Sequence, residues 1–198
     1  MSHQHVIFND VSFTYDTAVS PLLEGFSAHF PSGWTGVVGA NGSGKSTLLK
    51  LAVGDLVPRG GRVDIPDHAI YCPQRTDEPP PMLDLLLEAA DAEAFKKRNR
   101  LGIGSDWLER WPTLSHGERK RAQIGTALWL EPLVLAVDEP TNHLDLPSIR
   151  CLEEALSDCP CGLLLVSHDE RFLDALTCTR WQIVMRKKND KDYQLSVI

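Results

Sequence analysis

A glycine-rich stretch in the first quarter of the chain reads Gly39-Ala40-Asn41-Gly42-Ser43-Gly44-Lys45-Ser46-Thr47. It fits the pattern G-x-x-x-x-G-K-[ST], in which backbone N–H groups fold around phosphate oxygens. The apolar run at 34–38 before it predicts a strand, and the helical spacing at 46–53 after it predicts a helix that ends at Gly54. A loop between a strand and a helix is the context that a phosphate-binding site of this kind requires.

Each residue type in this loop has a chemical use. The glycines let the main chain approach phosphate oxygens without obstruction by side chains, and a helix N-terminus carries about half a positive charge. Lys45 is long enough to reach the terminal phosphates, and the Ser46 hydroxyl is a ligand that Mg²⁺ accepts. The alternative interpretation is a glycine-rich turn with a solvated lysine. We expect a nucleotide-phosphate site.

Two acidic residues follow a second apolar run. Residues 133–137 predict a buried strand, and Asp138 and Glu139 come directly after it, before Pro140. Ligands bind at the carboxyl ends of the strands in open α/β sheets. We therefore expect Asp138 to bind Mg²⁺ and Glu139 to orient and polarise an attacking water. The alternative for this stretch alone is an acidic turn in solvent.

Strand and helix patterns alternate along the rest of the chain. Further strands are predicted at 62–65, 69–72, 162–166, 181–185 and, after a turn at 186–192, 193–198. Further helices are predicted at 82–100, 115–130, 147–156 and 170–176. The alternation predicts an α/β fold with a mainly parallel core sheet, and Val11, Phe13 and Tyr15 alternate with polar residues as in a strand.

Length and charge limit the classes of protein that fit. The chain has 198 residues, with 20 Lys+Arg against 27 Asp+Glu and a net charge of -7. The length fits one domain over 1–198. The negative charge excludes a globally basic surface that binds nucleic acid through its overall field, so only a local patch is left for that purpose. Two basic clusters, 96–100 and 119–121, are candidates, and the alternative for both is a solvated helix face.

Targeting signals and cysteine spacing indicate where the protein is located and whether its cysteines are reduced. The uncharged apolar runs are far shorter than the roughly 18 residues that a membrane-spanning helix needs. The N-terminal residues lack a signal-peptide pattern, so we expect a cytoplasmic protein. The cysteines do not have the paired spacing of a zinc site, and we expect reduced, mostly buried thiols at Cys72, Cys151, Cys159, Cys161 and Cys178.

Four motifs, in their order along the chain, resemble those of an ATP-binding cassette (ABC) ATPase. They are the loop at 39–47, Leu114-Ser115-His116-Gly117-Glu118, Asp138-Glu139-Pro140-Thr141-Asn142-His143-Leu144-Asp145 and Ser167-His168-Asp169. The third is most similar to the soluble subfamily F (ABC-F), many of whose members act on ribosomes. The resemblance implies a P-loop NTPase fold with an N-terminal antiparallel β part and a short helical subdomain at 75–130. It also implies Mg²⁺-dependent ATP hydrolysis.

The resemblance also implies roles for residues outside the loop. Gln74 matches the Q-loop glutamine that contacts Mg²⁺ and water, Tyr15 the aromatic that stacks on adenine, and His168 the switch histidine at the γ-phosphate. Asp145 matches the D-loop acid at a dimer interface. Without the resemblance, Gln74 is a loop residue, Tyr15 a core-facing strand residue and His168 a structural histidine. The implied catalytic set is Glu139, His168, Lys45 and Gln74.

The motif Ser115, His116, Gly117, Glu118 has two interpretations that are compatible. It predicts a capping box, with Ser115 as the N-cap and Glu118 as the third helical residue. By resemblance it is also the signature that contacts ATP held by the opposite cassette. His116 departs from the family's glycine, which places a ring where the backbone would approach phosphate.

A single set of motifs implies a partner. The resemblance implies that two cassettes close on ATP, so the second is another copy of this chain, the other half of a longer parent, or another cassette protein. Beyond ATP and Mg²⁺, we expect ribosome or RNA contact through the basic clusters. The alternatives are an ATPase subunit for a separate membrane permease, and a protein that binds ATP as a structural clamp. The presence of both Glu139 and His168 argues against a structural clamp, because the resemblance gives both residues a role in hydrolysis.

Overall fold

A mainly parallel sheet holds the phosphate-loop stretch in its interior. The computed structural model describes residues 4–185 and 193–197, and within them this sheet has the order β5-β6-β7-β3-β8-β9. Its strands are β3 (Trp34–Gly39), β5 (Ala69–Cys72), β6 (Val134–Asp138), β7 (Gly162–Val166), β8 (Thr179–Met185) and β9 (Tyr193–Val197). Neighbours from β5 to β8 pair parallel, and β9 pairs antiparallel with β8. The predicted α/β fold with a mainly parallel core sheet is confirmed.

The central strands are buried on both faces, which explains their continuous apolar sequences. In β6, Leu135 and Val137 face one core cluster, while Val134 and Ala136 face the other. A parallel strand covered on both faces has no polar side, and β6 and β7 are buried at every position. The acidic end of β6 is therefore the point where polar chemistry begins.

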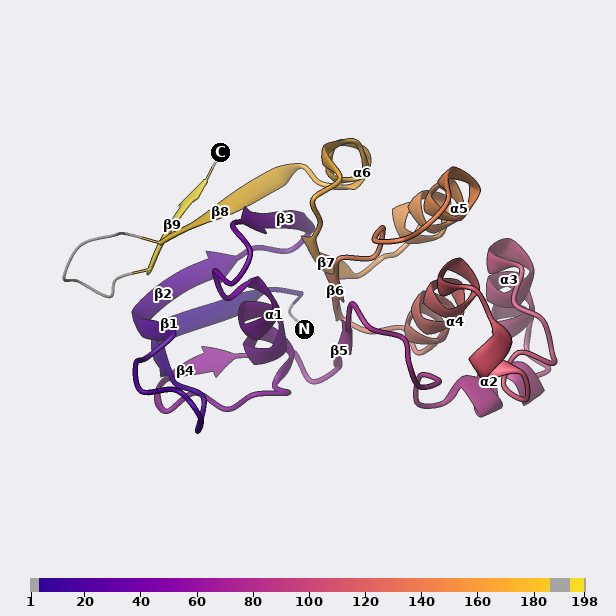
Figure 1. Cartoon of the computed structure of the whole chain (residues 1–198), viewed down its shortest axis with the longest axis horizontal. Helices are drawn as coiled ribbons and strands as arrows, with labels where there is room; N and C mark the ends of the chain where they lie inside the picture. Colours follow the sequence, from indigo (N-terminus) through magenta and orange to yellow (C-terminus); the bar gives the residue numbers. More distant parts are fainter. Residues whose placement is uncertain (1–3, 186–192, 198) are drawn as a thin grey trace.

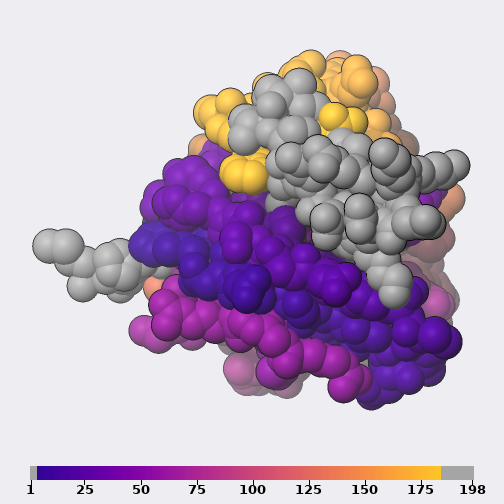
Figure 2. All heavy atoms as spheres, turned by 90° about the vertical axis from the view of Figure 1, so that its left-hand side faces the viewer, coloured from indigo at the N-terminus to yellow at the C-terminus, as the bar shows by residue number. Residues whose placement is uncertain are grey.

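An antiparallel sheet covers one face together with the first helix. β1 (Val6–Phe13) pairs antiparallel with β2 (Leu23–Phe30) and β4 (Gly60–Asp64), in the order β2-β1-β4. Helix α1 (Lys45–Val53) buries Leu48, Leu49, Leu51 and Ala52 in the cluster that this sheet shares with β6 and β7. Figure 1 shows α1 beside these strands, and Figure 2 shows the indigo N-terminal strands across this end of the molecule. The predicted antiparallel part is confirmed.

The remaining helices lie away from the antiparallel sheet. They are α2 (Leu83–Glu88), α3 (Ala92–Leu101), a 3₁₀ turn at Trp111–Thr113, α4 (His116–Trp129), α5 (Leu146–Ser157) and α6 (Glu170–Leu176). Figure 1 shows α2, α3 and α4 gathered beside α5, at the end of the molecule farthest from β1 and β2. The capping box at Ser115 is confirmed: its hydroxyl accepts from Glu118 N at 3.2 Å, and Glu118 Oε2 accepts from Ser115 N at 2.7 Å.

The single helix predicted at 82–100 is wrong, because two helices fill this stretch. The backbone at Ala89 is extended, and the Asp91 side chain caps α3 by accepting from Ala94 N at 2.8 Å. Arg98 then donates to the carbonyls of Leu87 and Ala89, which lie at the end of α2. A local cap and an arginine across the gap thus satisfy the backbone groups that a continuous helix would have paired.

The expectation of five reduced thiols is also wrong. Cys159 and Cys161 form a disulfide, and their Cα atoms lie 5.3 Å apart in the short connection between α5 and β7. This separation lies within the range that a disulfide spans. Cys72, Cys151 and Cys178 are free, as expected. The turn predicted at 186–192 lies outside the described residues. In the part that the structure describes, we find no helix that is long and apolar enough to span a bilayer.

Gly61 permits the close pairing of β4 with an irregularity in β1. Its φ is +71°, and an added Cβ would lie 2.2 Å from the Asp10 carbonyl oxygen. We expect Gly61→Ala to lower the free energy of unfolding by about 1–3 kcal/mol, measured by urea denaturation. Gly60→Ala is the matched control, because its nearest neighbour would be 3.7 Å away. Equal unfolding midpoints for the two variants would contradict this account.

Candidate functional site

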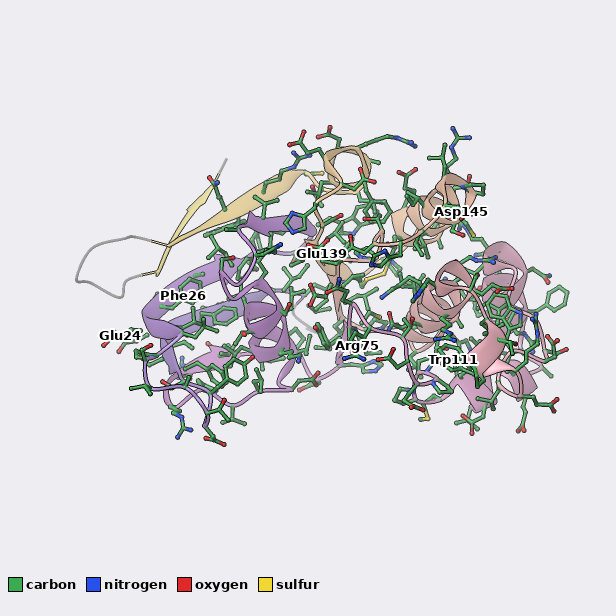
Figure 3. The ribbon with its side chains drawn as sticks, in the orientation of Figure 1. Glu24, Phe26, Arg75, Trp111, Glu139 and Asp145 are labelled. Atoms are coloured by element: carbon green, nitrogen blue, oxygen red, sulfur yellow. A yellow bond between two sulfur atoms is a disulfide. The ribbon has the colours of Figure 1, made fainter. Side chains whose placement is uncertain are left out.

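A cavity of about 490 Å³ lies where the core strands end. It brings together residues from the phosphate loop, the ends of β5 and β6, and the segment after β7; its lining is Tyr15, Leu22, Asn41, Gly42, Gly44, Lys45, Ser46, Thr47, Gln74, Asp138, Glu139, Asn142 and His168. Figure 3 shows Glu139 near the centre of the molecule, at the ends of these strands. Most residues that the sequence singled out for phosphate, Mg²⁺ and water therefore share one cavity.

The loop presents positive charge to this cavity. Gly44 has a left-handed backbone and directly precedes α1, whose first N–H groups have no acceptor within the helix. Lys45 is buried, and its Nζ donates to the carbonyls of Gly39 at 2.9 Å and Ala40 at 3.1 Å. An ammonium group and a helix N-terminus in one place make an anion site. Gly39, Ala40 and Ser43 belong to the loop but do not line the cavity.

The acid pair sits opposite the loop. Asp138 is 3% exposed, and Tyr71 Oη on the neighbouring β5 donates to its Oδ2 at 2.8 Å. Glu139 has a left-handed backbone with φ of 44°, and its N–H donates to the Val166 carbonyl at 2.8 Å. That bond fixes the acid pair to the end of β7. A strained conformation held by the surrounding structure is typical of functional sites.

His168 closes the polar cluster. Its N–H donates to Glu139 Oε2 at 3.2 Å, and its Nε2 lies 3.1 Å from Glu139 Oε1 and 3.1 Å from Asn41 Oδ1. The ring thus stands between the acid and the phosphate loop. Burial raises the pKa of the Glu139 carboxyl, which the nearby His168 and Lys45 oppose in part. A carboxylate with a raised pKa is a better proton acceptor for water than an ordinary one.

Tyr15 and Gln74 line the same cavity from two further segments. β1 ends at Phe13, so Tyr15 leaves the strand, is 40% exposed and shares a 2.8 Å hydrogen bond with Thr47 Oγ1. It is therefore not the core-facing residue of the alternative interpretation. Gln74 follows β5 by two residues and, like Tyr15, is exposed and lines the cavity. An aromatic ring is able to stack on a base, and an amide oxygen is able to bind a metal ion.

The signature motif and Asp145 lie outside this cavity. Asp145 caps α5 by accepting from Ser148 N at 3.0 Å, and Figure 3 shows it at α5, apart from Glu139. An added Cβ at Gly117 would lie 2.5 Å from Ser148 Oγ, so the starts of α4 and α5 pack directly together. His116 is exposed, with its ring 5.9 Å from that of His143. Close packing against Ser148 explains why position 117 is a glycine, whereas the exposed position 116 has room for a histidine side chain.

Five residues of the two basic clusters make contacts within the fold, so the presence of the clusters does not by itself argue for RNA contact. Arg98, Arg100, Arg119, Lys120 and Arg121 all donate to backbone carbonyls. Arg100 also pairs with Asp158. These contacts hold connections between helices in place, so the clusters have a structural use that does not depend on RNA. Lys120 is buried and is not part of a solvated face, whereas Lys96 is exposed.

Two residues that line the cavity, and one residue that hydrogen bonds to Asp138, were not predicted. Leu22 packs beside Gly44, Asn142 follows the acid pair, and Tyr71 holds Asp138. Asn142 stands inside the quoted motif, which was a usable signal. No signal in the sequence pointed to Tyr71, because its place in a predicted strand does not reveal toward which face of the sheet its side chain points.

The residues present fit a nucleotide with Mg²⁺. Glu139 lines the cavity, and its buried Oε1 makes no hydrogen bond of good geometry among the described residues. Ser46, Gln74 and Asp138 offer the oxygen ligands that Mg²⁺ prefers, and this ion is usually held by one or two carboxylates together with substrate phosphates.

Comparisons with known proteins agree with this geometry. Residues 23–142 match the sequence profile of the ABC transporter family. The chain is 34% identical to the ABC transporter ATP-binding protein ARB1 of Saccharomyces cerevisiae, over 92% of this chain and 34% of that protein. It is 33% identical to ATP-binding cassette sub-family F member 2 of Bos taurus, over 73% of this chain and 25% of that protein.

Two further likenesses differ in how much of the other protein they cover. A protein of Nitratidesulfovibrio vulgaris, described as an ABC transporter ATP-binding protein, is 32% identical over 89% of this chain and 74% of its own length. The structure of a bacterial Atm1-family ABC exporter with ATP bound has a TM-score of 0.74 at 21% identity, over 91% of this chain and 37% of that one. The chain thus spans a quarter to three quarters of the length of these relatives.

The buried Glu139 carboxylate gives a pH-dependent stability. Its pKa is raised in the folded state, so the unfolded chain releases this proton first and stability falls as pH rises from the ordinary glutamate range to the raised value. We expect Glu139→Gln to unfold at higher urea concentration than the wild type at pH 7, with the difference shrinking toward pH 4. Glu88→Gln, at an exposed position, is the control. A Glu139→Gln difference that grows on acidification would overturn the assignment.

Proposed function

Because the chain belongs to the ABC family of ATPases, we propose that it binds ATP with Mg²⁺ in the 490 Å³ cavity and hydrolyses it there while a second cassette closes the site. The observation that carries this proposal is the meeting of Lys45, Glu139 and His168 in one cavity. Membership of this family indicates that the chain is an ATPase, and the roles of individual residues that follow are proposed here.

Binding relies on the loop and the acid at the end of β6. Lys45 and the N-terminus of α1 attract the β- and γ-phosphates, and Tyr15 at the rim stacks on adenine. Ser46, Asp138 and Gln74 would hold Mg²⁺, which would supply positive charge against the negative charge that develops on the phosphate oxygens. Tyr71 keeps the Asp138 carboxylate in one orientation through its 2.8 Å hydrogen bond.

Hydrolysis relies on Glu139 and His168. Glu139 accepts a hydrogen bond from water and orients it toward the γ-phosphorus; the water oxygen bonds to phosphorus as the bond to the ADP oxygen breaks. His168 contacts both Glu139 and Asn41 of the loop, which supports a hydrogen bond from its ring to a γ-phosphate oxygen. The raised pKa of Glu139 helps this carboxylate to take the proton of water.

The second cassette supplies the signature. Ser115, Gly117 and Asp145 stand at two neighbouring helix N-termini outside the cavity, and helix N-termini favour anions. We propose that this pair of helix ends faces the ATP of a partner, while the partner's own pair faces the ATP held here. A two-fold operator satisfies both contacts with one sequence. The exposed His116 then meets the partner's phosphates by a side-chain N–H in place of a backbone approach.

Removing the Glu139 carboxylate tests hydrolysis and closure together. We expect Glu139→Gln to release phosphate about 10²- to 10⁴-fold more slowly, since it loses a general base, while it retains ATP. With ATP and Mg²⁺ it should elute from gel filtration as a dimer, and Glu88→Gln should behave as the wild type does. Phosphate release equal to the wild type would remove the catalytic role, and a monomer at high concentration would remove self-pairing.

The biological task that we propose is a cytoplasmic, subfamily F-type switch on the ribosome. The support is the motif from Asp138 to Asp145 and the identity to a sub-family F member, and not the basic clusters. The alternative is a subunit that energises a separate permease. One observation favours it: a largely apolar cavity of about 670 Å³ between β5, Pro79–Pro81 and α4, next to the Gln74 segment.

A pull-down distinguishes these two partners. Glu139→Gln held in excess ATP is captured from a lysate with detergent, and the bound material is analysed for ribosomal RNA and for membrane proteins. We expect ribosomal RNA, enriched at least tenfold over a Lys45→Ala control that cannot hold phosphate. A permease without ribosomal RNA would replace the ribosome proposal with the transporter one and leave the ATPase intact.

A further inference from the structure

A buried lysine of α4 holds the segment that carries Gln74. Lys120 is 3% exposed, although lysine is almost never fully buried unless its charge is paired. Among the described residues, no carboxylate lies within ion-pair distance of its Nζ. The Nζ instead donates to three neutral oxygens: the Pro73 carbonyl at 2.7 Å, the Gln74 carbonyl at 3.1 Å and Gln123 Oε1 at 2.8 Å.

Gln123, one turn further along α4, extends the same contact. It is 7% exposed, and its Nε2 donates to the Arg75 carbonyl at 3.5 Å. Two side chains of one helix thereby hold three consecutive carbonyls, from Pro73 to Arg75. Figure 3 shows Arg75 where the chain passes from β5 toward the helices. This segment carries the Gln74 side chain that lines the ATP cavity.

The cost of burying this charge argues for a purpose beyond packing. A buried ammonium without a carboxylate loses its hydration and recovers only hydrogen bonds, and an apolar side chain of similar size would pack more favourably. Lys120 also lies in the same helix as Ser115 and Gly117, only five and three residues away. Helix α4 therefore connects the Pro73 and Gln74 carbonyls, which Lys120 holds, to its own N-terminus, which we propose faces the partner's ATP.

We propose that Lys120 is a positioning residue that couples Gln74 to the N-terminus of α4, so that ATP in this chain's cavity orders the end of the helix that faces the second cassette. The inference rests on the proposed function, and it adds a residue that touches neither nucleotide nor metal. Gln123 supports it by orienting the ammonium and extending the hold to Arg75.

Hydrogen exchange with and without ATP and Mg²⁺ tests the proposal in the full chain. In the wild type we expect ATP to slow exchange both in the loop at 39–47 and at the start of α4, residues 115–120. Lys120→Met keeps the length of the side chain but removes its donors; it should retain the loop protection and lose most of the protection at 115–120. Its kcat should fall about tenfold, with ATP affinity changed less than twofold.

Controls separate the possible failures. Arg119→Met removes a neighbouring cation that holds the carbonyls of Trp111 and Pro112, and it should keep both protected regions. Lys120→Arg should restore protection at 115–120 and most of the wild-type kcat, and it remains a usable variant if Lys120→Met does not fold. Unchanged protection at 115–120 in Lys120→Met, or no rescue by arginine, overturns the coupling. No loop protection in the wild type overturns the proposed function instead.

Discussion

Opposite charges meet at the carboxyl ends of three neighbouring strands, and the arrangement of the molecule follows from that meeting. β3 leads into Lys45 and the start of α1, β6 ends in Asp138 and Glu139, and β7, between them, is followed by His168. The acids are buried at the end of an apolar strand, so they lack the water that solvates a carboxylate at an exposed position. Their negative charge is tolerable because a lysine and a helix N-terminus stand opposite, and because Tyr71 and His168 hydrogen bond to them.

The helical side of the molecule depends on the same edge of the sheet. Lys120 holds the segment that follows β5, and Gly117 lets the start of α4 pack against Ser148 of α5. The end of α4 therefore has little freedom to move without the chain beside the cavity. Under the proposed function, this connection would link the ATP cavity of one cassette to the surface that faces the ATP of the second cassette.

Sequence reasoning succeeded where a pattern is local and has a single physical cause. The apolar β6, the loop before α1 and the capping box at Ser115 all have this character. It failed where the partner of a group comes from elsewhere in the chain. Arg121, for example, binds the carbonyl of Leu101, which no local pattern reveals. The break between α2 and α3 was missed because apolar periodicity continues across it, while Asp91 supplies a competing cap.

The central claim is that one cavity of this chain holds a triphosphate and Mg²⁺ between Lys45 and Asp138. Isothermal titration of the purified chain with a non-hydrolysable ATP analogue, in the presence and absence of Mg²⁺, tests it directly. The account predicts one Mg²⁺-dependent site per chain, lost in Lys45→Ala while the fold is retained. Absence of binding by the folded wild type, or equal binding by Lys45→Ala, would contradict it.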